Sequence, residues 1–193
     1  MDVPDEDIRL MLLFQGGEAS CFEELVERHK NRVFNLAYRF LGNSHEAQDI
    51  AQEVFIKIYH AKDTYRPQAK FTTWLYIICK NTCLKALRKK KPAAISIDDT
   101  LELAEGSVAP QLADTSTPSP SASLLNSERA SVIKEAVDSL PANQKMALVL
   151  CRYEQLSYEE AAEVIGCSVK AVKSLLHRAK INLKEGLAAY LEK

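Results

Sequence analysis

Basic and hydrogen-bonding side chains recur on one face of a helix predicted to begin at Ser168. Five basic residues and no acidic residue lie between positions 168 and 184. Val169, Val172 and Leu176 recur at three- and four-residue steps, so they predict a buried stripe that turns the basic face toward solvent. Cations neutralise DNA phosphates, and side-chain hydrogen bonds read base edges. The candidate DNA-contacting residues on this face are Lys170, Lys173, Ser174, His177 and Arg178.

The segment before Ser168 predicts how this basic helix is presented. Ser157 and Glu160 have the spacing of a capping box, and Gly166 suits the left-handed residue that ends a short helix. Ser168 then predicts the N-cap of the following helix. The pattern indicates a helix-turn-helix, whose second helix enters the major groove of DNA. Hairpins of this kind with a solvated basic face also occur as structural elements, so this segment alone leaves both interpretations open.

A second candidate DNA-contacting stripe lies on a helix predicted from about Phe71 to Lys90. Asn81, Lys85 and Arg88 recur there at steps of four and three, and they lead into further lysines. An asparagine amide can read a base edge, and a row of cations can hold the phosphate backbone. Trp74 shares the stripe, and we expect it to anchor the core rather than to stack on a base.

A mixed polar and apolar face is predicted on the helix that Asn43 and Glu46 would open. Opposite its apolar stripe, this helix places carboxylates beside an isoleucine that would be exposed. A face of this composition is better explained by a protein partner than by solvent, which is the alternative. The residues on this face are Asp49, Gln52, Glu53, Ile56 and His60.

Apolar periodicity is helical on both sides of one long interruption in this chain of 193 residues. The interruption, residues 92–127, holds four prolines, seven serines, five acidic residues and no basic residue. Such a composition is typical of a flexible linker. We therefore predict an all-α protein with two small helical domains, at residues 5–91 and 128–193, of which the second contains the helix-turn-helix.

Cap signals predict the helices within each domain. In the first domain, Ser20 and Glu23 predict a capping box at the start of a long helix that Gly42 would end. In the second domain, helices near residues 126–139 and from Pro141 to about Arg152 precede the helix-turn-helix. Together these elements would make a four-helix unit of the size of a small DNA-reading domain.

Composition argues against several classes of protein. The N-terminus is acidic, and no apolar run approaches the roughly 18 residues that span a bilayer, so we expect a cytoplasmic protein without membrane insertion. The five cysteines form no Cys-x-x-Cys pair, no histidine follows a glutamate at a three-residue step, and no phosphate-binding glycine-rich loop occurs. We therefore expect no catalytic residue, no metal and no cofactor.

Five motifs follow one another along the chain, and together they resemble a bacterial sigma-70 family factor of the extracytoplasmic-function group. The resemblance covers nearly the whole chain except the linker, and the ordered set is far more specific than any one motif. The motifs are Asp49-x-x-Gln52-Glu53-Val54-Phe55-x-Lys57-x-Tyr59, Phe71-x-Thr73-Trp74-Leu75-Tyr76, Ser139-Leu140-Pro141, the run from Leu156 to Ala162, and the run from Ser168 to Ala179.

The resemblance implies a two-domain subunit of RNA polymerase, in which region 2 binds the core enzyme and the −10 promoter element, and region 4 binds the −35 element. The loop from Lys70 to Thr73, with Asn81, would capture an unstacked −10 base, and the cations that follow would hold the backbone. The residues implied to dock on the coiled coil of the largest polymerase subunit are Asp49, Gln52, Glu53 and Phe55. Those implied to bind −10 DNA are Lys70, Thr73, Asn81, Lys85, Arg88 and Lys89. Those implied to read the −35 element are Lys170, Lys173, Ser174, His177 and Arg178.

The partners that the resemblance implies are core RNA polymerase, promoter DNA and an anti-sigma factor. The alternative function is a one-component transcriptional regulator, in which the first domain senses a ligand or dimerises and the helix-turn-helix binds an operator. That alternative explains the second domain equally well, but it gives no reason for the basic stripe at Asn81 or the carboxylate face at Asp49.

The acidic linker is long for this group, and we predict that it occupies the RNA channel of the polymerase, with a passive tether as the alternative.

Overall fold

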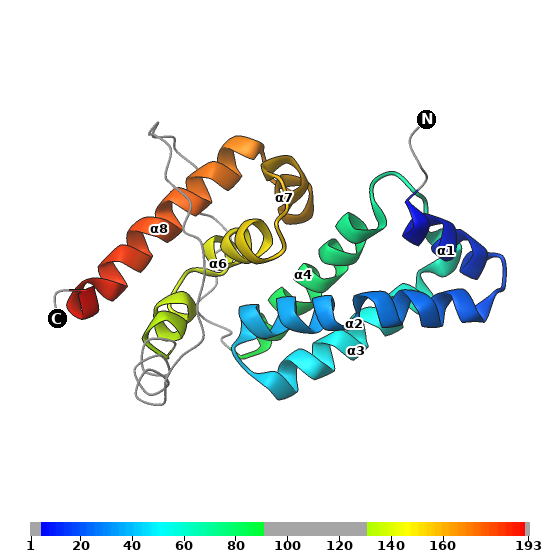
Figure 1. Cartoon of the computed structure of the whole chain (residues 1–193), viewed down its shortest axis with the longest axis horizontal. Helices are drawn as coiled ribbons and strands as arrows, with labels where there is room; N and C mark the ends of the chain where they lie inside the picture. Colours follow the sequence, from blue (N-terminus) through cyan, green and yellow to red (C-terminus); the bar gives the residue numbers. More distant parts are fainter. Residues whose placement is uncertain (1–4, 91–130, 192–193) are drawn as a thin grey trace, which may run out of the picture.

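A computed structural model describes residues 5–90 and 131–191 of the chain. All regular secondary structure in these two ranges is helical, which confirms the predicted all-α fold. Figure 1 shows two groups of helices, with residues 5–90 on the right and residues 131–191 on the left. The first group contains α1 (Glu6–Gln15), α2 (Ala19–Leu41), α3 (Ser44–His60), the 3-10 turn η1 (Lys62–Thr64) and α4 (Phe71–Lys90). The second contains a helix at residues 131–138, α6 (Ala142–Leu148), the π-helical turn η2 (Val149–Tyr153), α7 (Tyr158–Ile165) and α8 (Val169–Leu191).

The hairpin of α2 and α3 forms where the sequence predicts it. Gly42 ends α2 in the left-handed conformation, with φ at 75°. Asn43 then opens α3, because its side-chain oxygen accepts a hydrogen bond from the backbone amide of Glu46 at 3.2 Å. Val54 and Ile58 of α3 are fully buried, so the opposite face of this helix points away from the core.

The beginning of α2 differs from the prediction. Helix α2 begins at Ala19 with Glu18 as its N-cap residue, and no side chain caps it, so the predicted capping box of Ser20 and Glu23 is wrong. Gly17 adopts a φ of 111°, which lets the chain reverse direction early and start the helix before Ser20 can act as the cap.

Helix α4 lies against α2 and α3 and contributes much of the shared core. Phe71, Cys79 and Cys83 are fully buried, so both cysteines act as apolar core residues, as expected. A hydrogen bond with Cys83, together with burial, raises the pKa of the Cys79 thiol and keeps it protonated. Trp74 packs against this core with its ring centroid 4.8 Å from that of Tyr65, which confirms that it is an anchor.

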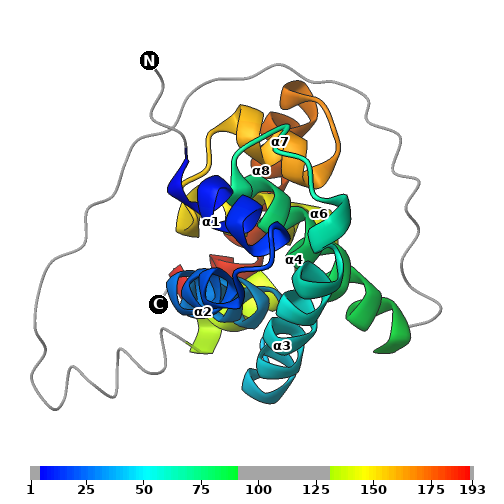
Figure 2. The ribbon, with the colours of Figure 1, turned by 90° about the vertical axis from the view of Figure 1, so that its right-hand side faces the viewer.

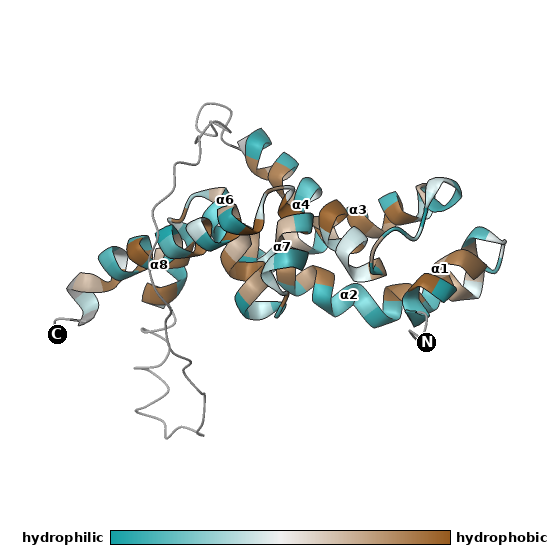
Figure 3. Cartoon of the chain, turned by 90° about the horizontal axis from the view of Figure 1, so that it is seen from above, coloured by the Kyte–Doolittle hydropathy of each residue, from teal (hydrophilic) through white to brown (hydrophobic). Residues whose placement is uncertain are grey.

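Helix α1 is an element that the sequence patterns did not resolve. Leu10, Met11 and Phe14 are buried against the neighbouring helices, and Asp5 caps the N-terminus by accepting a hydrogen bond from the amide of Asp7 at 3.1 Å. Figure 3 shows apolar and polar positions alternating along the helices of both groups, as expected of helices that bury one face.

The helix-turn-helix follows the predicted caps closely. Ser157 and Glu160 form a complete capping box at the start of α7, and Gly166 ends α7 with φ at 82°. The hydroxyl of Ser168 accepts a hydrogen bond from the amide of Ala171 at 3.1 Å and opens α8. Before this motif, α6 begins one residue after Pro141, and the predicted helix widens into η2 over its last turn.

The two groups of helices pack against each other, with α7 lying beside α4 (Figures 1 and 2). Buried residues of both groups form one continuous apolar cluster. Within the described ranges, no helix is long and apolar enough to cross a membrane. The predicted acidic linker and Lys91 lie outside the described residues, and the proposed division into two domains stays a prediction.

Candidate nucleic-acid and polymerase-binding surfaces

The predicted DNA-reading face of α8 is open to solvent. Val172 and Ala179 are buried on the opposite side of the helix and attach it to α6 and α7. The ammonium of Lys173 lies 5.7 Å from the ring centroid of Tyr158, a residue of α7, so the two helices of the motif also meet at their outer edge. Lys170, Lys173 and His177 are exposed, and Ser174 and Arg178 are half-buried on the same face.

Four of the candidate −10 residues on α4 are exposed at the helical spacing that the sequence predicts. Asn81 and Arg88 are exposed on the outer face of the helix. Lys85 and Lys89 are also exposed, but they lie toward α3, where they contribute to the positive field around Glu53. Part of the positive charge of the predicted stripe therefore acts on the predicted polymerase-docking helix.

Lys57 connects the predicted docking helix to α4. Its ammonium lies 2.7 Å from a carboxylate oxygen of Glu53 and donates a hydrogen bond to the hydroxyl of Thr82 at 2.8 Å. That hydroxyl in turn donates to the carbonyl of Ile78 at 2.8 Å. The hydrogen bond from Lys57 is the main reason that the pKa of Glu53 is lowered, with a smaller contribution from the other nearby lysines.

The exposed face of α3 has the mixed character that the sequence predicts. Asp49 and Gln52 are exposed, and they lie on the same helix as two exposed apolar side chains, Ile56 at 56% and Tyr59 at 47% exposure. Exposed large apolar residues beside carboxylates mark a surface that is suited to a protein partner. Phe55 differs from its predicted neighbours, because its side chain is half-buried against the core.

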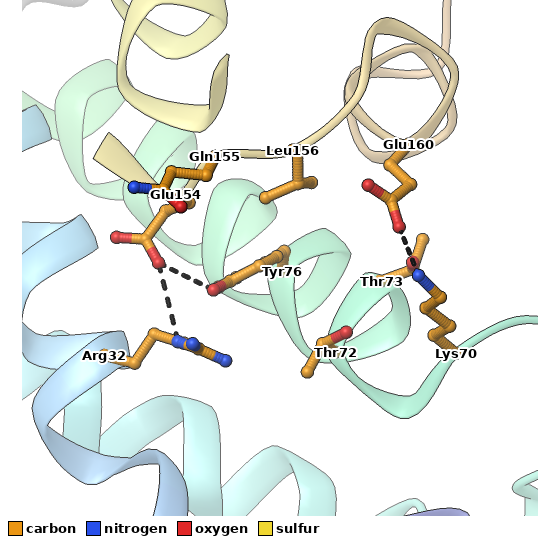
Figure 4. A pocket seen from close by; sticks show the side chains of 9 residues that line it. All are labelled: Arg32, Lys70, Thr72, Thr73, Tyr76, Glu154, Gln155, Leu156 and Glu160. Carbon is orange, nitrogen blue, oxygen red and sulfur yellow. Dashed lines mark hydrogen bonds and ion pairs between the residues drawn. The ribbon is translucent and has the colours of Figure 1, made fainter. Parts of the chain in front are cut away.

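Three polar contacts join α4 to the second group of helices, and two of them appear in Figure 4. The ammonium of Lys70 lies 2.7 Å from a carboxylate oxygen of Glu160, and the hydroxyl of Tyr76 donates to Glu154 at 2.7 Å. Lys80 donates to the carbonyl of Ile165, the last residue of α7, at 3.1 Å. Lys70, directly before α4, and Lys80 within α4 therefore hold α7 at its acidic first turn and at its C-terminal end.

The charged groups between the two groups of helices differ in how far they are buried. A hydrogen bond from Lys70 lowers the pKa of Glu160, but solvent screens this exposed ion pair, so it contributes little to the stability of the contact. The side chain of Glu154 is only 8% exposed and also lies 3.7 Å from the guanidinium of Arg32. Burial lowers the pKa of Lys80, which is consistent with an ammonium enclosed between the two groups.

A small pocket lies between the groups and contains two of the predicted −10 residues (Figure 4). Thr73 is 3% exposed there, whereas the side chain of Lys70 is 66% exposed and its ammonium is paired with Glu160. Gln155 lines the same pocket in a left-handed conformation, with φ at 55°, where the chain turns from η2 toward α7. Sequence reasoning missed Tyr76, Lys80 and Glu154, because their contacts join residues far apart in the chain.

No group of three or more histidine, cysteine or acidic side chains is arranged to hold a metal ion within residues 5–90 and 131–191. The chemistry that these surfaces offer is hydrogen bonding and charge pairing with a partner. Two basic surfaces, on α4 and α8, fit phosphate, and the face of α3 fits a protein.

Comparisons with known proteins match both groups of helices. The family model for sigma-70 region 2 matches residues 25–92, and that for sigma-70 region 4 matches residues 131–183. The RNA polymerase sigma-H factor of Pseudomonas aeruginosa is 34% identical over 190 residues, which cover 97% of this chain and 96% of that protein. The ECF RNA polymerase sigma factor SigW of Bacillus subtilis is 33% identical over 171 residues, which cover 89% of this chain and 91% of that protein.

A solved structure matches the fold along nearly the whole chain. The structure of CnrH in complex with the cytosolic domain of CnrY gives a TM-score of 0.69 at 25% identity and covers 96% of this chain and 99% of CnrH. The two ranges that match the family models correspond to the two groups of helices, whereas α1 precedes the first of these ranges.

Proposed function

The chain belongs to the sigma-70 family, in its extracytoplasmic-function group, and we propose that it binds core RNA polymerase and directs it to promoters through their −10 and −35 elements. The observation that carries this function is the ordered match of region 2 and region 4, with a helix that exposes basic residues in each group. Co-purification with core polymerase, followed by transcription from a specific promoter, tests it. A one-component regulator would instead bind its DNA without polymerase.

We assign the protein a binding role rather than a catalytic one, and we place its action in the cytoplasm with RNA polymerase. Relatives that match along most of the chain are sigma factors, which supports both statements. An anti-sigma factor is the further partner that membership of this group leads us to expect. The complex of CnrH with the cytosolic domain of a second protein is consistent with that expectation.

In this proposal, each exposed surface has its own partner. The face of α3 around Asp49 docks on the polymerase, the outer face of α4 around Asn81 reads the −10 element, and α8 reads the −35 element. The α8 face is already exposed, whereas Thr73 is buried and the ammonium of Lys70 is paired with Glu160 of α7. We infer that α7 releases Lys70 when the loop before α4 binds the −10 element, whereas Asn81, Lys85 and Arg88 are exposed without such a change.

Substitution of Asn81 by alanine should relax the preference of the holoenzyme at one position of the −10 element, because an exposed amide on α4 reads one base edge. Lys85→Ala should instead weaken initiation on all promoters. It should also lower the slope of log affinity against log salt concentration by about one, as expected for the loss of one phosphate contact. Transcription from a library of −10 variants measures both effects. Lys30→Ala, which removes an exposed lysine of α2, serves as the control. An equal loss on every −10 variant for Asn81→Ala would contradict the assignment.

Glu160→Gln combined with Glu154→Gln should raise the affinity of the free protein for a single-stranded −10 oligonucleotide. Glutamine at position 160 can preserve the capping box but not the ion pair with Lys70, so the change acts on the contact between the groups. The double variant loses the surface ion pair of Lys70 and the charged hydrogen bond of Tyr76. We therefore expect its affinity for the oligonucleotide to rise about fivefold or more. The oligonucleotide carries the −10 sequence of a promoter mapped with the holoenzyme.

Glu159→Gln with Glu163→Gln is the matched control, because it removes the same charge from exposed positions of α7 that do not contact α4. An equal gain in affinity for the control pair would attribute the effect to net charge. In that case, the contact between the groups would not restrict access to DNA.

A further inference from the structure

Helix α1 lies outside the two ranges matched by the family models, yet it contacts both ends of the loop that precedes α4. This loop runs from Lys62 to Lys70 and leads directly into the residues proposed to capture the −10 base. At its start, the side-chain amide of Gln15 donates to the carbonyl of Lys62 at 2.8 Å and to that of Asp63 at 3.3 Å. At its end, a carboxylate oxygen of Asp5 accepts a hydrogen bond from the amide of Phe71 at 3.2 Å.

The contact from Asp5 provides a cap that α4 cannot provide for itself. The residue before α4 is Lys70, whose side chain has only donors and cannot accept from the amides of the first turn. Asp5 supplies the missing acceptor across 66 positions of sequence, while its other oxygen caps α1 through the amide of Asp7. One carboxylate therefore binds the positive ends of two helices, and the side chain of Lys70 stays available as a cation.

Further contacts hold α1 in place beneath the loop. Asp7 lies 2.8 Å from the ring nitrogen Nε2 of His29, a buried residue of α2. The same histidine ring packs on Phe71, with the two centroids 5.4 Å apart. The first residue of α4 thus contacts both α1 and a residue that α1 binds, so a displacement of α1 would be transmitted to the start of α4.

We propose that Asp5 and Gln15 form an α1 brace, which positions the loop and the first turn of α4 for recognition of the −10 element. Neither residue needs to touch DNA, so both are positioning residues. Fixing both ends of a loop reduces the conformations that it loses on binding, and a site held in its productive geometry discriminates better between bases. The inference rests on the proposed promoter-reading function and assigns part of its specificity to a helix that precedes the range matched by the region 2 family model.

The test compares Asp5→Ala/Gln15→Ala with the control Glu6→Ala/Arg9→Ala. The control pair lies on the same helix, joins two exposed side chains at 3.5 Å, and does not contact the loop. Holoenzymes made with each variant are assayed on promoters that differ singly in the −10 or the −35 element. If the brace positions the loop, Asp5→Ala/Gln15→Ala should lower the discrimination of the holoenzyme among −10 sequences about fivefold and leave its discrimination among −35 sequences unchanged. Fivefold is the ratio expected for the loss of one helix cap.

Hydrogen exchange on the free protein gives a second readout that is independent of transcription. In Asp5→Ala/Gln15→Ala, the amide hydrogens of Phe71 and of the loop from Lys62 to Lys70 should exchange faster than in the unmodified protein. The exchange rates in α2, α3 and α8 should stay unchanged. Unchanged exchange in the loop, or an equal loss of −10 and −35 discrimination, would exclude the brace. Failure of the unmodified protein to initiate transcription would instead reject the proposed function, and the exchange experiment would still decide on the brace.

Discussion

We expect Asp49→Lys to abolish the association of the protein with core RNA polymerase and to leave its fold unchanged. Asp49 is exposed on α3, opposite the buried residues Val54 and Ile58. Reversal of a surface charge of this kind usually changes the free energy of unfolding by less than about 0.5 kcal/mol. At an interface, loss of one partner of a close charge pair costs about 2–5 kcal/mol, which is at least about thirtyfold in affinity.

The structure identifies Asp49 as a cleaner target than Glu53 for this experiment. Glu53 is hydrogen-bonded to Lys57, which also holds Thr82 of α4. A lysine at position 53 would face Lys57 and two further cations, so Glu53→Lys would disturb the contact of α3 with α4 in addition to any docking surface. A loss of polymerase binding in that variant would therefore have two explanations.

Pull-down with core polymerase measures the effect of Asp49→Lys, and a thermal melt checks the fold. Glu23→Lys makes the same change of charge at an exposed position of α2 and serves as the control. Retention of full core binding by Asp49→Lys would show that this face is a solvated surface. Equal losses in both variants would show that only the net charge of the protein matters.

Alanine substitutions on α8 should separate base contacts from phosphate contacts at the −35 element. Arg178→Ala should weaken initiation on the cognate element by about 1–3 kcal/mol, which reaches roughly a hundredfold, and have little effect on elements mutated at the base that it reads. Lys173→Ala should weaken initiation on every −35 sequence alike, as expected of a phosphate contact. The physical reason is that only a base contact depends on the identity of the base.

Transcription from a −35 library measures this difference within the holoenzyme, where both elements are read together. Lys184→Ala is the matched control, because Lys184 is exposed on α8 but lies outside the five proposed contacts. A melt of Arg178→Ala is also needed, since this half-buried residue has further contacts within the protein. If Lys170→Ala, Lys173→Ala and Arg178→Ala all initiate like the unmodified protein on every promoter, α8 does not read the −35 element.

Features set by local chemistry could be predicted from the sequence. The caps at Asn43 and Ser157 and the left-handed ends at Gly42 and Gly166 involve residues within one helical turn, so their spacing alone identifies them. The same logic failed at Ser20, because the conformation of Gly17 moved the beginning of α2. A local cap pattern therefore predicts that a helix begins nearby. It is a weaker guide to the residue at which the helix begins.

Contacts between distant segments could not be predicted in this way. Lys70 and Glu160 are 90 positions apart, and nothing in either motif indicates that one binds the other. The acidic segment around Asp5 has the composition of a solvated terminus, although its N-cap position and the apolar residues that follow are signals of a helix. The sequence predicted binding surfaces on α3, α4 and α8, and the structure added that Glu160 of α7 pairs with Lys70 and that α1 contacts both ends of the loop before α4.

The most direct test of the proposed function is transcription of the genomic DNA of the source organism by core polymerase, with and without the purified protein, followed by mapping of the RNA 5′ ends. If the protein is a sigma factor that reads two elements, new start sites should appear, and they should share a −10 and a −35 sequence at a fixed separation. The Asp49→Lys variant should not produce these start sites. The account would be contradicted if the protein added no start sites and failed to bind core polymerase, yet bound specific DNA on its own, as a one-component regulator does.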